Sequence, residues 1–596
     1  MGTADEQRYW LPQRYWAWAL NRRVWVVLFW VGTFAIAAHH IEGGRSWLAN
    51  EPDTAEPFRR PDSGGQGHTQ IDFGGQWVMG RMIVKGYGQE LYHRQRQWDV
   101  VRESYPRSAE TPVQISETIL PKKQWIHAKS DDDLGHDADR MMFWFMGKDQ
   151  EEWKVVGGAA ATPLAIDFLG NPFASAVRCQ AAAAAVTPEV KKAVEEPAIG
   201  GPLYPPIHGF IYAPLALIDS PQTAYFLFLF LAVGFGILAG LGIAIVTGRR
   251  IWWPLASAAV LLYPGCRFGI ELGQNPTLSL CIVAWGWVLA ARRRDWAAGM
   301  VWGLFAFKPV WGMAFFLVPL LMGRWRMCVA MVGTGAGLAA LTLPFVGLHS
   351  WFEWLSVGTE AAELYTRSLN WINLSRDLQG IPRRFLHDFD LPQKDRETMQ
   401  AKVVAWTLWG VVFSATVLIY RFRADRRKCV GLGAAFLFLG AWLTCYRFMY
   451  YDVLLSIMGV ACLAAEPWRL FQSRPFTFAA NQSLPGAEPL ASTQRFGPRR
   501  VGYVNSLPLT VLLLLYLHDN WFVRLAMEAT FGVQSWSSDV TAPDGSMKTV
   551  LPRIHFTSSI YYAWDTALVL VLWVWCGWRL LLGDEPRAER SAPPRG

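Results

Sequence analysis

The chain has 596 residues, of which 52% are hydrophobic, and its formal net charge at neutral pH is +8. It contains 32 Trp, a residue that concentrates at membrane–water interfaces because its ring is half apolar and its N–H stays hydrated. Many apolar runs, each of about 18 to 25 residues, alternate with short basic loops, which excludes a soluble globular protein. The basic residues cluster beside these runs and mark cytoplasmic ends, so we expect no nucleic-acid partner.

The basic clusters predict the topology. The N-terminus, 1–23, is cytoplasmic, and the first span delivers an external loop, 42–201, that carries an insertion at about 93–200. The expected spans are roughly 11 to 13 by length. In chain order they are 24–41, 224–247, 252–268, 276–291, 296–322 as two short helices, 327–346, 403–420, 430–446, 452–465, 504–517 and 561–582. The Pro-rich piece at 204–218 either crosses the membrane or re-enters it.

The block at 296–322 needs a special arrangement. It lies between the basic cluster 292–294 and Arg324, both of which should remain cytoplasmic. The block is too long for one upright span and short for two. It is therefore expected to go out and return as two short helices that meet near Lys308. Irregular backbone at that depth is tolerated only where protein or a wet cavity surrounds it.

The polar residues of the apolar region fall at or beyond the outer ends of the spans in this topology. Ionisable groups near membrane depth are costly and usually line a cavity. A single acid among several arginines, one lysine and several amides indicates a site for an anionic ligand with one general base, because Arg and Lys both bind phosphate. The candidates are Asp72, Tyr204, Gln274, Asn275, Lys308, Asn373, Arg376, Arg384 and Arg447.

These residues also have simpler interpretations. Asp72 precedes a short amphipathic stretch and could act only as its N-cap. Lys308 could extend toward the membrane interface or face a pore, and Arg447 could be an interface anchor. The acidic run at 131–133 is read as solvated, and no metal and no cofactor is expected.

Five motifs occur in the order typical of one enzyme family. They are KGYGQELY at 85–92, LYPPIHGFIYAPLALI at 203–218, ELGQNPTLSL at 271–280, AAGMVWGLFAFKPVWGMAFFLVPLL at 297–321 and NLSRDLQGIPRRF at 373–385. Together they resemble glycosyltransferase family 87, also called DUF2029, whose members use polyprenyl-phosphate-mannose to make α-1,2-mannosyl linkages. The resemblance covers roughly 24–465, so the last two spans fall outside it.

The resemblance carries over residue by residue. Asp72 matches the catalytic acid of the first external loop, Tyr204 the Tyr-Pro-Pro element, and Gln274 with Asn275 the Gly-Gln element. Lys308 matches a Lys-Pro element, and Asn373 opens an Asn-Gln-Ser pattern in which Leu374 replaces Gln, with Arg384 following. The sequence departs from the family at 447–451, where Arg-Phe-Met-Tyr-Tyr replaces an expected Ser/Trp/His pattern.

The resemblance implies an all-α polytopic membrane protein with the C-type glycosyltransferase (GT-C) fold and long extracytoplasmic loops. The expected domains are a GT-C-like catalytic domain at 24–465, a cytoplasmic loop at 466–503, two C-terminal spans with an external loop at 504–582, and a cytoplasmic tail at 583–596. Such an enzyme would work in a bacterial inner membrane.

The implied reaction moves a mannose-like hexose from a polyprenyl-phosphate donor to a lipid or glycan acceptor at the outer face, with inversion. Asp72 would be the general base, and Lys308 with the arginines would bind the donor phosphate.

Two other functions stay open at this stage: a transporter or flippase of a lipid-linked or anionic solute, and a structural membrane subunit. A transporter built from internal repeats is disfavoured, because the two halves of the chain do not repeat. The enzyme hypothesis predicts that Asp72, Lys308 and Arg384 converge on one outward site.

Overall fold

The computed structural model describes residues 22–49, 72–93, 96, 100, 103–104, 142–149, 152–160, 204–367, 372, 374–388, 396–466, 507–517, 538–541, 547–550 and 563–583. Most of the predicted insertion, residues 467–503 of the cytoplasmic loop and residues 584–596 of the tail lie outside these residues, as does the acidic run at 131–133.

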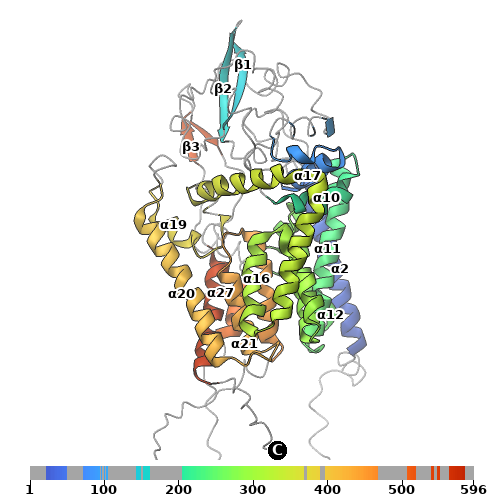
Figure 1. Ribbon diagram of the computed structural model, residues 1–596, viewed down its shortest axis with the longest axis vertical. Helices are drawn as coiled ribbons and strands as arrows, with labels where there is room; N and C mark the ends of the chain where they lie inside the picture. Colours follow the sequence, from blue (N-terminus) through green and yellow to red (C-terminus); the bar gives the residue numbers. More distant parts are fainter. Residues whose placement is uncertain are drawn as a thin grey trace, which may run out of the picture.

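Within the described residues, five helices are long and apolar enough to cross a membrane. They are α2 (Arg22–Ala49), α11 (Pro221–Val246), α17 (Trp325–Arg367), α20 (Met399–Arg423) and α27 (Trp564–Leu581). In Figure 1 these helices and their shorter neighbours run side by side as one bundle. The expectation of an all-α polytopic membrane protein is confirmed.

Several apolar helices inside the bundle are too short to cross the hydrocarbon region alone. The group consists of α12 (Trp253–Leu262), α14 (Pro276–Ala291), α16 (Pro309–Met322), α21 (Leu432–Leu443), η7 (Tyr450–Ser456) and α22 (Ile457–Ala464). The 16 residues of α14 span roughly 24 Å at 1.5 Å per residue, which is less than the roughly 30 Å of the hydrocarbon core. Buried polar residues flank three of these helices: Asn275 precedes α14, Lys308 precedes α16 and Thr444 follows α21.

The helix break at Lys308 is confirmed. The chain runs through α15 (Asp295–Gly303) and a 3₁₀ turn, η5 (Leu304–Phe307), and begins α16 at Pro309. Lys308 has a non-helical backbone, with φ −138° and ψ 73°, as a residue before proline should. Pro309 then serves as the first helical residue, where its missing N–H has no cost.

α17 changes direction near its middle. Gly347 has φ 68° and ψ 171°, which is not helical, and the helix bends there. The predicted span 327–346 ends at this bend, and the remainder of α17 runs across the upper end of the bundle in Figure 1. A short helix, α19 (Gly380–Leu386), follows between the predicted spans 327–346 and 403–420.

The helix predicted after the first span is present as α4 (Asp72–Val84), and it packs against α10 (Pro206–Ala216). Glycines allow this close approach: a Cβ at Gly80 would lie 2.8 Å from the backbone of Tyr212, and one at Gly209 would lie 3.1 Å from Met79 Cβ. As a result α4 is buried on all sides from Phe73 to Gly80. With 11 residues, α10 is too short to span, which favours re-entry for the segment 204–218.

Two antiparallel hairpins interrupt segments that were predicted to be external. β1 (Met142–Asp149) pairs with β2 (Glu152–Ala160), and β3 (Ser538–Thr541) pairs with β4 (Met547–Val550). The described residues also form two further short helices, α13 (Cys266–Glu271) and α24 (Leu507–Leu517).

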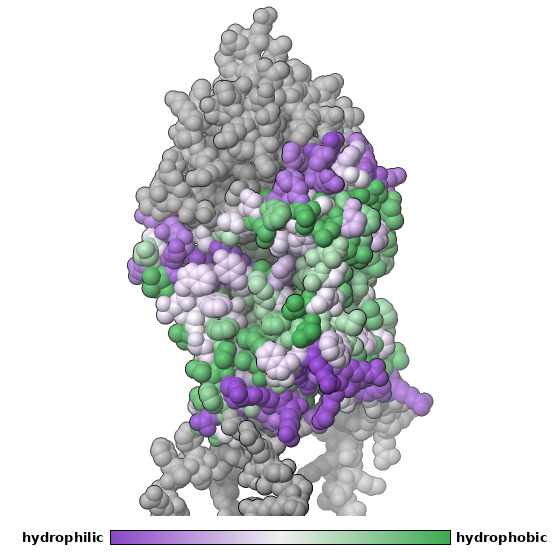
Figure 2. Space-filling view, in the orientation of Figure 1, coloured by the Kyte–Doolittle hydropathy of each residue, from purple (hydrophilic) through white to green (hydrophobic). Residues whose placement is uncertain are grey.

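The surface of the bundle fits a lipid environment. Figure 2 shows apolar residues over the middle of the bundle and a hydrophilic band across its lower end. Large apolar side chains are exposed on the long helices, for example Val31 on α2, Val329 on α17 and Val411 on α20. The exposed basic residues at 249–250, 292–294 and 421–423 lie at helix ends, as expected for cytoplasmic termini.

Candidate active site

The side chain of Gln76 is the centre of a buried hydrogen-bond cluster. Its Nε2 donates to the carbonyl of Gly273 at 2.9 Å. Its Oε1 accepts from Asn275 Nδ2 at 3.1 Å and lies 2.9 Å from His208 Nε2. Because Oε1 can only accept, His208 carries a proton on Nε2. The cluster joins α4, α10 and the turn before α14 at one buried point.

Three aromatic rings on α10 and just before it stack beside this cluster. Tyr204 and His208 have ring centroids 3.9 Å apart, and His208 and Tyr212 have centroids 4.9 Å apart. Their spacing of four residues places the side chains on one face of the chain. The hydroxyl of Tyr204 donates to Gln274 Oε1 at 2.8 Å, so the stack also reaches the 273–275 turn.

Gly273 brings the first turn of α4 against this turn. Its φ is +73°, a left-handed conformation that glycine adopts without strain. A Cβ at Gly273 would lie 2.4 Å from Phe73 Cβ, so the two backbones are in close contact. Asp72, the neighbour of Phe73 and the first residue of α4, therefore begins the helix beside the turn. The side chain of Asp72 lies outside the described part of the structure.

Lys308 forms a buried ion pair with Asp452, which lies on η7. Its Nζ donates to both carboxylate oxygens, at 2.7 and 2.9 Å, and both side chains are buried. Trp442 Nε1 donates to the main-chain carbonyl of Asp452 at 3.1 Å, and the ammonium lies 5.3 Å from the ring centroid of Tyr451. The break between α15 and α16 thus places a fixed positive charge inside the bundle.

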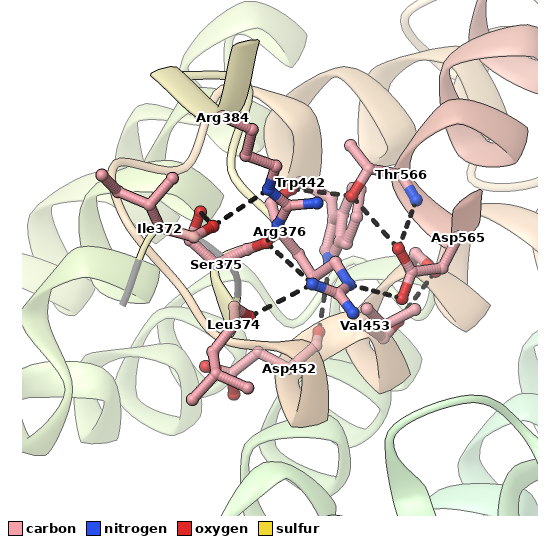
Figure 3. A network of polar contacts seen from close by, with 11 residues as sticks. Ile372, Leu374, Ser375, Arg376, Arg384, Trp442, Asp452, Val453, Asp565 and Thr566 are labelled. Atoms are coloured by element: carbon pink, nitrogen blue, oxygen red, sulfur yellow. Dashed lines mark hydrogen bonds and ion pairs between the residues drawn. The ribbon is translucent and has the colours of Figure 1, made fainter. Parts of the chain in front are cut away.

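Arg376 is held by a network of protein partners (Figure 3). Its Nε donates to Asp565 Oδ2 at 2.8 Å, and its Nη1 donates to the carbonyl of Ser375 at 2.9 Å. The hydroxyl of Thr566 donates to the carbonyl of Arg376 at 2.8 Å. The side chain of Arg376 is only 1% exposed, so Asp565 compensates its charge at close range.

Arg384 lies on α19 and also binds the turn at 374–376 that contains Arg376. Its Nε donates to the carbonyl of Ile372 at 2.9 Å, and its Nη2 donates to that of Ser375. Burial and, second, the charge of Arg376 lower the pKa of Arg384 to about 9. The guanidinium therefore still carries its charge at neutral pH.

Arg447 and Asn373 are the remaining candidates. Arg447 has a positive φ of 55°, its guanidinium lies 4.9 Å from the ring centroid of Tyr446, and its Nη1 donates to the carbonyl of Ala362 on α17. Asn373 lies outside the described residues.

These groups are linked by contacts. The ring of His208 lies 5.7 Å from that of Phe307, the residue before Lys308, so the cluster around Gln76 adjoins the ion pair. On the other side, Ser375 forms a β-bridge with Met449, three residues before Asp452. The structure therefore connects α4, Lys308 and Arg384 through one continuous set of contacts.

Several residues of this set were not singled out in the sequence. Gln76 lies in none of the five motifs, and His208 lies in the motif at 203–218 but was not named as a candidate. Each lies four residues after a candidate, Asp72 and Tyr204 respectively. Asp452 was not among the candidate site residues, and Asp565 lies in the last span, which the resemblance left out. Within the described residues, no group of three or more His, Cys, Asp or Glu is placed to hold a metal ion.

Gly273→Ala should distort this site. The new methyl group would force a strained φ and a contact with Phe73, and overpacking of this kind costs about 1–3 kcal/mol beyond the backbone strain. Gly323→Ala is the matched control, because Gly323 has φ +74° and nothing within 4 Å of its added Cβ. The unfolding midpoints of the two purified variants should differ, with Gly273→Ala clearly lower. Equal midpoints would contradict the close packing at the turn.

The comparison with known proteins gives the class of this membrane protein. It is an integral-membrane glycosyltransferase, an enzyme of the transferase class. Residues 203–446 match the model of glycosyltransferase family 87, a segment that covers less than half of the chain. No curated protein and no solved structure gives a significant match to the chain. The matched segment includes Gln274, Lys308 and Arg384 but not α4, η7 or α27.

Proposed function

We propose that the protein transfers a mannose-like hexose from a polyprenyl-phosphate donor to a lipid or glycan acceptor at the outer face of a bacterial inner membrane. The observation that carries this proposal is the set of contacts that connects α4, Lys308 and Arg384 at the outer ends of short helices. It supports the proposal because it links α4 to the buried pair of Lys308 and Asp452, in a chain whose residues 203–446 match the model of glycosyltransferase family 87. The GT-C fold is part of the proposal.

Asp72 is proposed as the general base. Gln76 lies one helical turn after it and points into the buried cluster, so the same face of α4 leads from the cluster to position 72. The carboxylate would accept the proton of the acceptor hydroxyl as its oxygen bonds to the anomeric carbon. The bond from that carbon to the phosphate oxygen breaks in the same step, which inverts the anomeric configuration.

The leaving group is polyprenyl phosphate, which departs with negative charge. Lys308 uses two N–H groups on Asp452, and its ammonium has a third hydrogen to donate. Asp452 keeps Lys308 in place, and preorganised positive charge of this kind stabilises the charge that develops in the transition state. Tyr204, Gln274, Asn275, Asn373, Arg376, Arg384 and Arg447 are proposed to line the donor site or support it. Because a lipid phosphate is already a good leaving group, the chemistry requires neither a metal nor a cofactor.

A transporter or flippase of a lipid-linked or anionic solute is the alternative. The observation that favours it is the buried pair of Lys308 and Asp452, because ionisable residues inside a helix bundle often mark a transport path.

The deciding experiment uses membranes that contain the protein and membranes that lack it. Labelled mannose is offered either as polyprenyl-phosphate-mannose or as a nucleotide sugar, with a mixed glycolipid fraction as acceptor. Protein-dependent transfer from the lipid donor alone is expected, with the anomeric configuration of the product opposite to that of the donor. Transfer only from the nucleotide sugar would refute the donor assignment. Movement of the intact lipid donor between leaflets without transfer would favour the transporter.

A further inference from the structure

We propose that Asp565 and Thr566, on the last helix and outside the segment matched by the family model, are positioning residues for the donor site. They hold Arg376 and, through the turn at 374–376, keep Arg384 aimed at the donor phosphate. This inference rests on the proposed function and adds residues of α27 to that site.

The first argument is the geometry of the contacts between α27 and the turn. Asp565 Oδ2 accepts from Arg376 Nε at 2.8 Å, while its Oδ1 accepts from the main-chain N–H of Thr566 at 2.7 Å. The Thr566 hydroxyl donates to the Arg376 carbonyl at 2.8 Å. Two adjacent residues of α27 thus bind both the side chain and the main chain of Arg376. This double attachment fixes the position of the residue as well as its charge.

The second argument is that the turn at 374–376 is also bound to residues 448–449, the segment that precedes η7. The N–H of Arg376 donates to the carbonyl of Phe448 at 2.9 Å, and Ser375 bridges Met449. The turn therefore lies between α27 and the segment that leads to Asp452, the partner of Lys308. A shift of the turn would therefore displace both positive groups of the proposed donor site, Lys308 and Arg384.

The third argument concerns charge. Arg376 and Arg384 both donate to the carbonyl of Ser375, so two like charges lie around one buried turn. Burial lowers the pKa of Arg384 most, the positive charge of Arg376 lowers it further, and Asp565 acts in the opposite direction. Asp565 therefore allows two guanidinium groups to occupy this buried region together. Arg384 is half-buried whereas Arg376 is buried, so Arg384 is the arginine assigned to the donor phosphate.

The test measures donor KM and kcat separately with purified full-length protein and a short-chain polyprenyl-phosphate-mannose. Asp565→Asn keeps the size of the side chain and one acceptor oxygen but removes the charge. Its donor KM should rise about tenfold, the scale of one charge-assisted hydrogen bond, while kcat and the acceptor KM change little. Thr566→Val removes the hydroxyl at constant shape and should raise donor KM about threefold, whereas Thr566→Ser should match the wild type.

The outcomes separate the two proposals. A wild-type enzyme that transfers no mannose from the lipid donor refutes the proposed function, and this inference with it. Wild-type transfer with an unchanged donor KM in folded Asp565→Asn refutes the inference alone, as does a fall in kcat without a change in KM. A purely structural role would lower the unfolding midpoint and leave donor KM unchanged. If Asp565→Asn does not fold, the Val and Ser variants of Thr566 decide the question by the same KM comparison.

Discussion

Asp72→Asn is expected to reduce sugar transfer about 10²-fold or more while the protein stays folded. An amide cannot accept the proton of the acceptor hydroxyl, so the step that forms the glycosidic bond loses its base. Asn is as good a residue as Asp at a helix start, so α4 should still begin at position 72. The measurement is the initial rate of transfer per folded protein, with folding judged by the thermal unfolding midpoint.

Asp219→Asn provides the matched control for this experiment. Its carboxylate belongs to the loop between α10 and α11 and its side chain is 85% exposed, paired only at the surface with Arg81. The same chemical change there should leave transfer near the wild-type rate. Equal transfer by wild type and Asp72→Asn would assign Asp72 to helix capping and move the base elsewhere. An equal loss of sugar transfer in both variants would mean that removing a carboxylate elsewhere has the same effect, and would not identify Asp72 as the base.

Breaking the ion pair between Lys308 and Asp452 should have the largest effect on stability. Removing one partner of a buried pair leaves an uncompensated charge and costs about 3–5 kcal/mol. Lys308→Met and Asp452→Leu are each expected to lower the free energy of unfolding by this amount, because both side chains are buried. Denaturant unfolding of the purified protein measures the change.

The double variant separates stability from catalysis. Lys308→Met with Asp452→Leu removes both charges and should be much more stable than either single variant. It should nevertheless fail to transfer sugar, because the charge proposed to stabilise the leaving phosphate is gone. Glu42→Gln, which alters an exposed pair with Arg45, should leave both properties unchanged. Full activity in the double variant would remove Lys308 from the proposed mechanism.

The features that the sequence predicted well depend on local pattern. Apolar length and the basic clusters predicted the break at Lys308, because two cytoplasmic ends require the chain to turn back between them. Proline favours the first position of a helix, and Pro276 marked the start of α14. The observed bounds of this helix, Pro276–Ala291, coincide with the predicted span. The start of α4 at Asp72 followed from an acid ahead of a periodic apolar run.

The pairing of distant residues could not be predicted in the same way. Lys308 and Asp452 are separated by 144 residues and Arg376 and Asp565 by 189, and no spacing rule connects such positions. No sequence pattern marked Asp565 as a site residue, since it lies in an apolar span that is outside the family motifs. α4 was expected to be amphipathic, yet it is buried on all sides over its first turns, because glycines on both helices bring α10 close to it.

The attachment of Arg376 to the last helix has a consequence for biosynthesis. A ribosome adds roughly 5–20 residues per second, so the 189 residues between Arg376 and Asp565 take roughly 10–40 s to make. During that interval Arg376 has been synthesised, but Asp565, whose carboxylate neutralises the charge of Arg376, has not. The nascent chain must therefore keep this turn hydrated, or shielded by an insertion factor, until α27 arrives. Completion of the donor site would then be one of the final events of assembly.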